Sequence, residues 1–548
     1  MPNPSPATRD RPRLSARELI ERTLDPGSWQ SWDEPVIDVG PLDADYAADL
    51  AEARARTGLD ESVITGEGTL KARPVALVIG EFGFLAGSIG VAAAERFVRA
   101  AEIARRRRLP LLASPSSGGT RMQEGTVAFL QMVKISTAIA AHRAAGLPYL
   151  VYLRHPTTGG VLASWGMLGH LCAAEPGALI GFLGPRVYEA LRGEPFPEGV
   201  QTAENLFRHG LIDAVVGPEQ LRRITSDVLD ILAEPSATPG RPASPPTTLG
   251  RPASPPTTLG CPSSLPATTG PTTGDPNPRT LDKDTTTDPD ALADRPAWES
   301  ITRSRRPDRP GIRGLLKLAA RTAVPLNGTG QGERDPGILL ALAQFGAARC
   351  VILGQNRRWA EIPIGPAGLR TARRGLRLAA ELGLPLVSVI DTAGAALSRE
   401  AEEGGLSAEI AWSLADLSAL TTPTVCLLLG QGAGGIALAL LPADRVLAAE
   451  QAWLSPLPPE GASAIVHRTT DRAPELAAAQ GIRAIDLLRN GIVDRVIREK
   501  PDAADEPEGF LRRVGAVLEQ ELLTVGALDP DHRLQVRSDR YRSLGLPS

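Results

Sequence analysis

The sequence repeats a set of landmarks at one fixed distance, and this repetition constrains the fold more than any other feature. Ile89-Gly90 and Ile364-Gly365 are 275 positions apart. The same offset relates Pro110 to Pro385, Pro148 to Pro423, Gly159-Gly160 to Gly434-Gly435, and Ala174-Glu175 to Ala449-Glu450. HGLIDAVV at 209–216 matches NGIVDRVI at 490–497 with an offset of 281, which indicates a short insertion. The chain is therefore predicted to contain two copies of one domain.

The two copies are separated by a segment that lacks the composition of a folded domain. Residues 236–290 hold 13 prolines and no aromatic residue, and GRPASPPTTL occurs there twice in tandem. Such a segment buries too little apolar surface to offset the entropy lost on ordering. We predict a disordered linker, although a Pro-rich tract can also be a peptide ligand. The predicted organisation is a disordered N-terminus at 1–13, a first domain at 14–235, the linker at 236–295, a second domain at 296–525 and a C-terminal tail at 526–548.

Each copy is built from one repeated unit, which consists of an amphipathic helix, a Leu-Pro opening, a short apolar strand and a turn rich in Gly or Ser. In the first copy AAERFVRAAEIARRR leads through LPLLAS into PSSGGTRMQEG, and in the second LRTARRGLRLAAELG leads through LPLVSVI into DTAGAALSREAEEGG. Short apolar strands that alternate with helices are typical of buried parallel sheets. Both copies are predicted to be α/β domains.

Composition excludes several classes of function. Lys+Arg 59 against Asp+Glu 63 gives a net charge of −4, so no basic excess indicates a nucleic-acid partner. No apolar run reaches the roughly 18 residues of a membrane helix, and the N-terminus lacks the apolar region of a signal peptide. We therefore expect a cytoplasmic protein with no membrane partner. The four cysteines and six histidines are scattered, so neither a zinc site nor metal-dependent hydrolysis is expected.

The two glycine pairs are the strongest candidates for chemistry. Gly159-Gly160 and Gly434-Gly435 each follow a predicted strand and begin a predicted helix. Glycine lets a ligand approach the backbone, and the unpaired N–H groups of a helix start can hold a developing oxyanion. One such pair alone is more often a simple packing turn, but its recurrence at matched positions favours a functional role. Neither pair belongs to a GxGxxG or GxxxxGK[ST] motif, and GxSxG is absent, so nucleotide-phosphate binding and serine hydrolysis are not indicated.

At this point the sequence resembles the carboxyltransferase component of bacterial acetyl-CoA carboxylase, in the crotonase-like superfamily. The first half is similar to the β subunit through GEGTLKARPVAL, GFLAGSIGVAAAERFVRA, SSGGTRMQEG, PTTGGVLASWGMLG and EPGALIGFLGPRVYE. The second half is similar to the α subunit through AWESITRSRRPDRP, LRLAAELGLPLVSVIDTAGA, AEEGGLSAEIA, GQGAGGIALAL and SPLPPEGASAIVHR. The resemblance implies a fusion of two crotonase-like (ClpP/crotonase) ββα-superhelix domains, joined by a disordered Pro/Thr-rich linker.

The resemblance also implies a reaction. A carboxyl group would move from carboxybiotin, carried on a separate protein, to acetyl-CoA, and malonyl-CoA for fatty acid synthesis would result. The biotin ureido nitrogen would take the α-proton, so the cofactor would supply the base. The N–H groups of Gly159 and Gly160 would hold the thioester enolate oxygen, and those of Gly434 and Gly435 the ureido oxygen. Gly118, Gly119 and Arg121 would form the acyl-CoA side of the pocket, with Arg121 and Glu124 holding the turn or making a purely structural ion pair.

Two further features have competing interpretations. The run Arg105–Arg108 could receive the CoA phosphates, but it also stands where a helix should end, where cations complement the helix dipole. His155 lies just before the first glycine pair, and an exposed loop histidine is the simpler interpretation. Both features are weaker candidates than the glycine pairs.

The sequence departs from the family at several places. The four-cysteine zinc ribbon that often begins the β subunit is absent, Ile436 stands where a glycine is expected, and the DTPGAYPG-type turn reads DTAGAALS at 391–398. No Met-Lys-Met biotin attachment site exists, so a biotin carboxyl carrier protein and an ATP-dependent biotin carboxylase are expected as separate partners. The family's usual assembly implies a homodimer or larger. A propionyl-CoA enzyme, a malonate decarboxylase component and a non-catalytic partner that binds acyl-CoA or the carrier remain alternatives.

Overall fold

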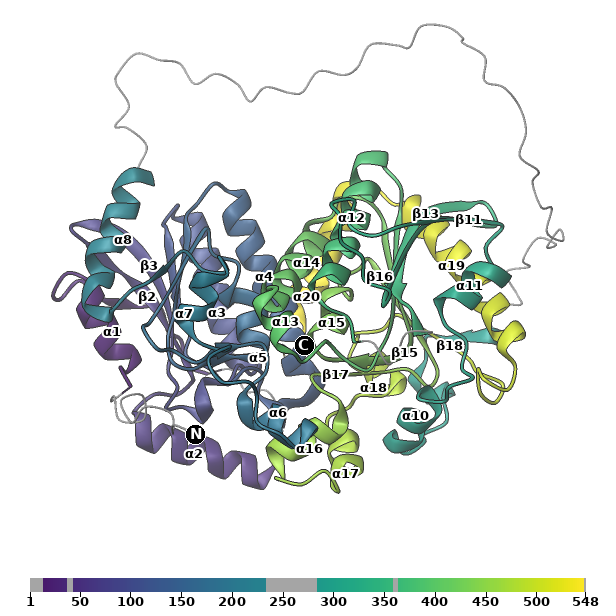
Figure 1. Cartoon of the computed structure of the whole chain (residues 1–548), viewed down its shortest axis with the longest axis horizontal. Helices are drawn as coiled ribbons and strands as arrows, with labels where there is room; N and C mark the ends of the chain where they lie inside the picture. The colour runs from purple at the N-terminus through teal and green to yellow at the C-terminus, as the bar shows by residue number, and fades with distance from the viewer. Residues whose placement is uncertain (1–12, 37–42, 233–282, 358–362, 547–548) are drawn as a thin grey trace, which may run out of the picture.

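The computed structural model describes residues 13–36, 43–232, 283–357 and 363–546. The predicted disorder at 1–12 and over most of the linker therefore lies outside the described residues. Figure 1 shows two α/β units side by side, the first in purple to blue and the second in green to yellow.

The first unit contains a seven-stranded sheet in the order β1-β2-β3-β4-β5-β7-β9. Its strands are β1 (Gln30–Ser31), β2 (Val63–Leu70), β3 (Arg73–Gly80), β4 (Leu111–Ser114), β5 (Tyr149–Leu153), β7 (Leu171–Ala174) and β9 (Ala214–Val215). β1, β2 and β3 pair antiparallel, and the pairing is parallel from β3 to β9. Buried parallel strands have apolar side chains on both faces, which explains the continuous apolar runs in β3, β4 and β5. A separate pair, β6 (Thr157–Thr158) and β8 (Ile180–Gly181), lies beside the first glycine pair.

The second unit contains a nine-stranded sheet of similar layout. Its strands are β10 (Thr285–Thr286), β11 (Thr322–Leu326), β12 (Ile338–Phe345), β13 (Ala348–Gln355), β14 (Leu386–Thr392), β15 (Thr424–Ala433), β16 (Arg445–Ala449), β17 (Trp453–Ser455) and β18 (Arg495–Ile497). β11, β12 and β13 pair antiparallel, and the pairing is parallel from β13 to β18. The sequence prediction of two α/β domains with parallel pairing is thus confirmed in this arrangement.

The predicted duplication is visible element by element. β2 and β12 begin 275 residues apart, as do β3 and β13, and the helices that follow these hairpins keep the same offset. One landmark is displaced by a residue. Ala174 lies opposite Leu153 in the first sheet, whereas Ala448, not Ala449, lies opposite Leu428 in the second. The insertion that changes the offset later in the chain therefore follows a one-residue deletion between β15 and β16.

Helices surround both sheets. In the first unit they are α1 (Ala16–Thr23), α2 (Ala44–Thr57), α3 (Val91–Arg106), α4 (Gly125–Ala144), α5 (Gly159–Val161), α6 (Pro185–Arg192), α7 (Ala203–Arg208) and α8 (Pro218–Leu232). In the second they are α10 (Ala297–Ser304), α11 (Ile312–Leu318), α12 (Pro366–Leu382), α13 (Arg399–Glu403), α14 (Leu406–Ala419), α15 (Gly434–Ala439), α16 (Pro459–Val466), α17 (Ala473–Ala479), α18 (Ala484–Arg489), α19 (Pro507–Gly526) and α20 (Pro530–Ser543). No helix within the described ranges has the length and apolarity to cross a membrane.

The two units share a core. α4 and the π-helical turn at Leu162–Gly166 of the first unit pack against α14 of the second, and α4 and α14 follow the equivalent strands β4 and β14. Figure 1 shows α4, α14 and α20 between the two sheets. Buried residues of both sheets and of these helices form one continuous apolar cluster. The two copies are consequently one packed body in the described chain.

The C-terminal segment predicted as a tail is part of this body. Arg537 on α20 binds the Asp444 carboxylate of the second unit at 2.7 Å, and Arg542 binds Glu95 of the first unit at 2.6 and 2.8 Å. Arg537 is 3% exposed although it is charged. The prediction was wrong because the arginines of α20 gave it the composition of a solvated segment, whereas their partners lie far away in sequence.

The predicted C-terminal boundary of the linker, at residue 295, also needs correction. Thr285 and Thr286 form β10, which pairs antiparallel with Ile497 and Val496 of β18. The second unit therefore begins before residue 296. A two-residue edge strand is too short for hydrophobic periodicity to reveal it, and its polar threonines resemble those of the linker.

Candidate active site

The glycine-rich segments of the first unit meet backbone to backbone. A Cβ added to Gly159 would lie 3.3 Å from the Gly118 oxygen and 3.3 Å from the Gly119 Cα. Gly159 has a φ of +66° and Gly119 a φ of +114°, conformations that favour glycine. The structure thus brings together the two segments that the sequence singled out in this half.

The N–H groups of the first glycine pair are not equivalent. The Gly159 N–H donates to the carbonyl oxygen of Phe182 at 3.1 Å. The Gly160 N–H has no acceptor among the described residues. The expectation that both groups hold a substrate oxygen is therefore corrected, because the first of them is already used within the fold. Gly160 is the available donor at the start of α5.

Gly118 and Gly119 also use their N–H groups within the fold. Gly118 donates to the Ala86 oxygen at 2.8 Å, and Gly119 donates to Ser117 Oγ at 3.0 Å. These two residues approach the backbone of the first glycine pair closely and offer no free donor of their own.

A turn with unusual backbone conformation lies beside Gly118 and was not predicted from the sequence. Leu85, Ala86 and Gly87 have φ values of +43°, +55° and +64°, so three consecutive residues are left-handed and two of them carry side chains. Strain of this kind is held by its surroundings and gathers at functional sites. Here the Ala86 carbonyl fixes Gly118. Gly87 is the one glycine among these three residues, and a single glycine does not predict a left-handed turn.

Arg121 does not face a ligand. Its side chain is 1% exposed, and its guanidinium donates to both carboxylate oxygens of Glu61 at 2.8 and 2.5 Å and to the Ser88 carbonyl at 2.7 Å. The predicted substrate-binding role is therefore corrected to the structural alternative. Glu124 accepts from the Val91 N–H at 2.6 Å and so caps the start of α3.

The second glycine pair has the same conformation and freer donors. Gly434 has a φ of +70°, and α15 begins at this residue without a side-chain cap. Within the described residues neither the Gly434 N–H nor the Gly435 N–H has an acceptor. Ile436 is fully buried in an apolar cluster with Leu406 and Ile410. The side chain that departs from the family pattern thus belongs to the packing between elements.

One residue touches both glycine pairs. The Phe182 carbonyl accepts from Gly159, and a Cβ added to Gly435 would lie 3.2 Å from a carbon of the Phe182 ring. Phe182 follows β8 in the first unit, whereas Gly435 lies at the start of α15 in the second. The two predicted half-sites are therefore neighbours within one chain, and Phe182 lies between them.

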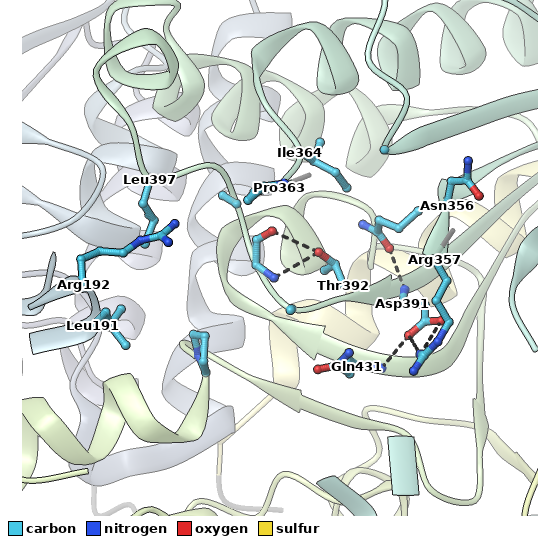
Figure 2. A pocket seen from close by; sticks show the side chains of 16 residues that line it. Leu191, Arg192, Asn356, Arg357, Pro363, Ile364, Asp391, Thr392, Leu397 and Gln431 are labelled. Atoms are coloured by element: carbon cyan, nitrogen blue, oxygen red, sulfur yellow. Dashed lines mark hydrogen bonds and ion pairs between the residues drawn. The ribbon is translucent and has the colours of Figure 1, made fainter. Parts of the chain in front are cut away.

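A cavity of about 280 Å³ opens at the carboxyl ends of β13, β14 and β15, and α6 of the first unit closes one side. Figure 2 shows Leu191 and Arg192 of α6 on that side and Asp391 on the other. Asp391 accepts from Arg357 Nη1 at 2.9 and 3.1 Å, and its own N–H donates to Gln355 Oε1 at 2.7 Å. Gln355 lines this cavity, and its Nε2 is buried without a partner in the described residues.

The remaining candidates lie apart from this chemistry. His155 is partly buried, and its Nδ1 accepts from the Leu179 N–H at 3.0 Å, so it is not the exposed loop histidine expected from sequence. Burial lowers the pKa of His155. The Arg105–Arg108 run is exposed at the end of α3, and Arg107 pairs with Glu67 at 2.7 Å. This arrangement fits the interpretation as a helix end. No group of three His, Cys, Asp or Glu side chains among the described residues is arranged to hold a metal ion.

Known proteins and family models match nearly the whole length of the chain. Residues 7–218 match the family model described as a carboxyl transferase domain, and residues 281–545 match the model described as acetyl co-enzyme A carboxylase carboxyltransferase-like. The chain is 56% identical, over 98% of its length and 99% of the relative, to the probable biotin-dependent acyl-coenzyme A carboxylase beta3 subunit of Mycobacterium tuberculosis (strain ATCC 25618 / H37Rv).

Other similarities are more distant. The chain is 37% identical to the acetyl-coenzyme A carboxylase carboxyl transferase subunits beta/alpha of Parafrankia sp. (strain EAN1pec), over 98% of this chain and 87% of the relative. A crystal structure of transcarboxylase 12S aligns over 93% of this chain and 89% of its own, at 20% identity and a TM-score of 0.35. Because both family models and both relatives agree, the chain belongs to the carboxyltransferase family of acyl-CoA carboxylases.

Proposed function

We propose that the chain is a biotin-dependent carboxyltransferase that moves a carboxyl group from carboxybiotin to acetyl-CoA and forms malonyl-CoA. The observation that carries this proposal is the recurrence of unpaired backbone donors at matched helix starts, Gly160 in the first half and Gly434-Gly435 in the second. Backbone donors fixed at a helix start are suited to a reaction that passes through an oxyanion.

In the first half the chain's contribution is electrostatic. The Gly160 N–H would donate to the thioester oxygen and strengthen that hydrogen bond as the oxygen becomes an enolate. The donor is preorganised, because Gly159 is held by Phe182 and by its contact with Gly119. A preorganised donor avoids the reorganisation that water would need during the reaction.

In the second half the residues present fit a ureido group. A urea oxygen accepts two hydrogen bonds, and the N–H groups of Gly434 and Gly435 offer two unpaired donors at the start of α15. When bound, biotin supplies the carboxyl group and the base. The chain would hold and orient the ureido oxygen, and no side chain would be needed as general base.

The acyl group is the finer part of the proposal. Acetyl-CoA is supported by the Parafrankia relative, which is named for acetyl-coenzyme A, and by the match of residues 281–545. The more similar Mycobacterium relative is named for an acyl-coenzyme A without a stated acyl group. Propionyl-CoA or another acyl-CoA is therefore the second candidate.

The structure offers support for catalysis over a purely binding role. The non-catalytic alternative drew on Ile436 and on the altered turn at 391–398. Ile436 packs into the protein and leaves the N–H face of α15 unobstructed by its side chain. The altered turn keeps a hydrogen bond from the Gly394 N–H to Thr392 Oγ1 at 3.1 Å, equivalent to the bond between Gly119 and Ser117.

The assembly follows from the same proposal. Both halves would be crotonase-like domains, and the chain would act in the cytoplasm with a biotin carboxyl carrier protein and an ATP-dependent biotin carboxylase. A homodimer or larger assembly is part of this proposal, as the resemblance to the family implies. No zinc is needed in this proposal.

A direct test compares acyl groups in the reverse reaction. The purified full chain is incubated with biocytin and with malonyl-CoA, methylmalonyl-CoA or a longer carboxyacyl-CoA, and loss of the carboxyl group is followed. A higher kcat/KM for malonyl-CoA supports acetyl-CoA as the acceptor. Turnover of methylmalonyl-CoA alone would leave the reaction class intact and overturn the acetyl assignment.

A further inference from the structure

A carboxylate of the second unit binds Phe182 of the first unit, the residue whose carbonyl accepts from Gly159. Glu402 lies on α13, immediately after the turn at 391–398 that lines the cavity. Its two oxygens accept from the Phe182 N–H at 2.8 and 3.0 Å, and Oε1 also accepts from Gln201 Nε2 at 2.6 Å. Both partners belong to the first unit, so Glu402 joins the two units at the site.

A chain of hydrogen bonds leads from this carboxylate to the glycine pair. Glu402 fixes the N–H of Phe182, and the carbonyl of the same residue accepts from Gly159. Gly159 is bonded covalently to Gly160, whose N–H is the free donor. The orientation of that donor is thus set by a side chain more than 200 residues away in sequence.

We propose that Glu402 is a positioning residue, whose ionised carboxylate holds Phe182 and thereby aims the Gly160 N–H at the substrate oxygen. This inference rests on the proposed function of the same site. The groups that face the carboxylate are all N–H donors, an arrangement that suits an acceptor-only group. A protonated carboxyl would place an O–H against these donors and weaken the bond to Phe182.

Burial raises the pKa of Glu402 to about 7. No cation among the described side chains lies within ion-pair distance of Glu402, whereas its neighbour Glu403 has two basic partners. Arg399 binds Glu403 at 3.0 Å, and His209 lies 3.7 Å from the same carboxylate. Because the carboxylate must be ionised to hold Phe182, the proposal predicts that the site is assembled above neutral pH and loosened below it.

The test uses Glu402→Gln, with Glu400→Gln as a matched control on the exposed side of the same helix. A glutamine keeps the size of the side chain but brings an NH2 group against the Phe182 N–H or Gln201. For the wild-type chain and the control, kcat of biocytin-dependent malonyl-CoA decarboxylation should fall about tenfold between pH 8 and pH 6. In Glu402→Gln the fall of kcat between pH 8 and pH 6 should be absent. Its kcat at pH 8 should be at least tenfold lower than that of the wild-type chain, with KM little changed.

A second measurement does not depend on turnover. Hydrogen exchange of peptides that cover 157–165 and 178–185 should be at least tenfold faster in Glu402→Gln than in Glu400→Gln, after correction for intrinsic rates. Unchanged exchange together with an unchanged pH profile would overturn the role of Glu402. If the wild-type chain turns over no acyl-CoA, the proposed function fails, and the exchange result still decides whether Glu402 holds this segment.

Discussion

Gly119 and Gly394 are 275 residues apart and occupy the same place in the two units. Each is left-handed, with φ of +114° and +132°, and each donates its N–H to a hydroxyl two residues earlier, Ser117 Oγ at 3.0 Å and Thr392 Oγ1 at 3.1 Å. The residues of these two turns otherwise differ. The backbone of the site has therefore kept its geometry in both copies, while side chains around it have changed.

The first prediction concerns the acyl-CoA side. Gly160 has an unstrained φ, so Gly160→Ala tests the available space and not the backbone conformation. The added Cβ would lie 2.9 Å from Thr120 Oγ1, so either that hydroxyl or the donor must move. Loss of an oxyanion donor typically costs about 10²–10³ in kcat, so a fall toward that range is expected with little change in KM for malonyl-CoA. Gly526→Ala is the control, because a Cβ there meets no atom within 4 Å. Equal kcat in both variants would remove Gly160 from the site.

The second prediction separates the biotin side from the acyl side. In Gly435→Ala the new Cβ would lie 3.1 Å from Ile410 Cδ1 and 3.2 Å from the Phe182 ring, so these side chains or α15 must move by a few tenths of an ångström. The KM for biocytin should rise or kcat should fall, while acyl-CoA binding measured by calorimetry stays within about twofold. If acyl-CoA binding were lost and the dependence on biocytin kept, the two glycine pairs would have to exchange roles.

A third prediction follows from the buried pair of Arg121 and Glu61. Breaking a buried ion pair on one side typically costs about 3–5 kcal/mol, since the other charge remains without a partner. Arg121→Met should therefore lower the free energy of unfolding measured in urea by an amount of that order. A stable variant with a raised KM for acyl-CoA would instead restore the substrate-binding role that the sequence suggested.

The fourth prediction concerns acid stability and α20. Although burial opposes ionisation of Glu95, its bonds with Arg542, Lys134 and Arg99 lower its pKa to about 2. A carboxylate with a pKa below its unfolded value favours the folded state above about pH 4.5, and this contribution is lost as the pH falls toward 2. Arg542→Ala should consequently move the acid-unfolding midpoint to higher pH in a circular dichroism titration. Arg108→Ala, in the exposed turn after α3, should leave the midpoint unchanged.

Much of the fold could be predicted from the sequence because the features that specify it are local or repeated. The constant offset revealed the duplication, and the alternation of apolar strands with amphipathic helices revealed the parallel sheets. The segment at 526–548 could not be recognised, because α20 is held by Arg537 and Arg542 bound to distant carboxylates, and hydrophobic periodicity does not report such contacts.

For the site, the glycine positions were predictable and their hydrogen bonds were not. The positive φ of Gly159 and Gly434 follows from a strand that turns directly into a helix. The use of the Gly159 N–H by Phe182, and the hold of Glu402 on Phe182, depend on how the two copies pack against each other. Arg121 was assigned by resemblance of its motif, and only its burial beside Glu61 shows what it binds.

The most direct test of the account is whether decarboxylation of malonyl-CoA by the purified chain depends on biocytin. It needs neither the carrier protein nor the carboxylase, so it examines only the site built by this chain. The account predicts turnover that is absent without biocytin, saturates as biocytin is added, and is reduced in both Gly160→Ala and Gly435→Ala. Binding of acyl-CoA without turnover of any carboxyacyl-CoA at any biocytin concentration would contradict it and identify the chain as a non-catalytic partner.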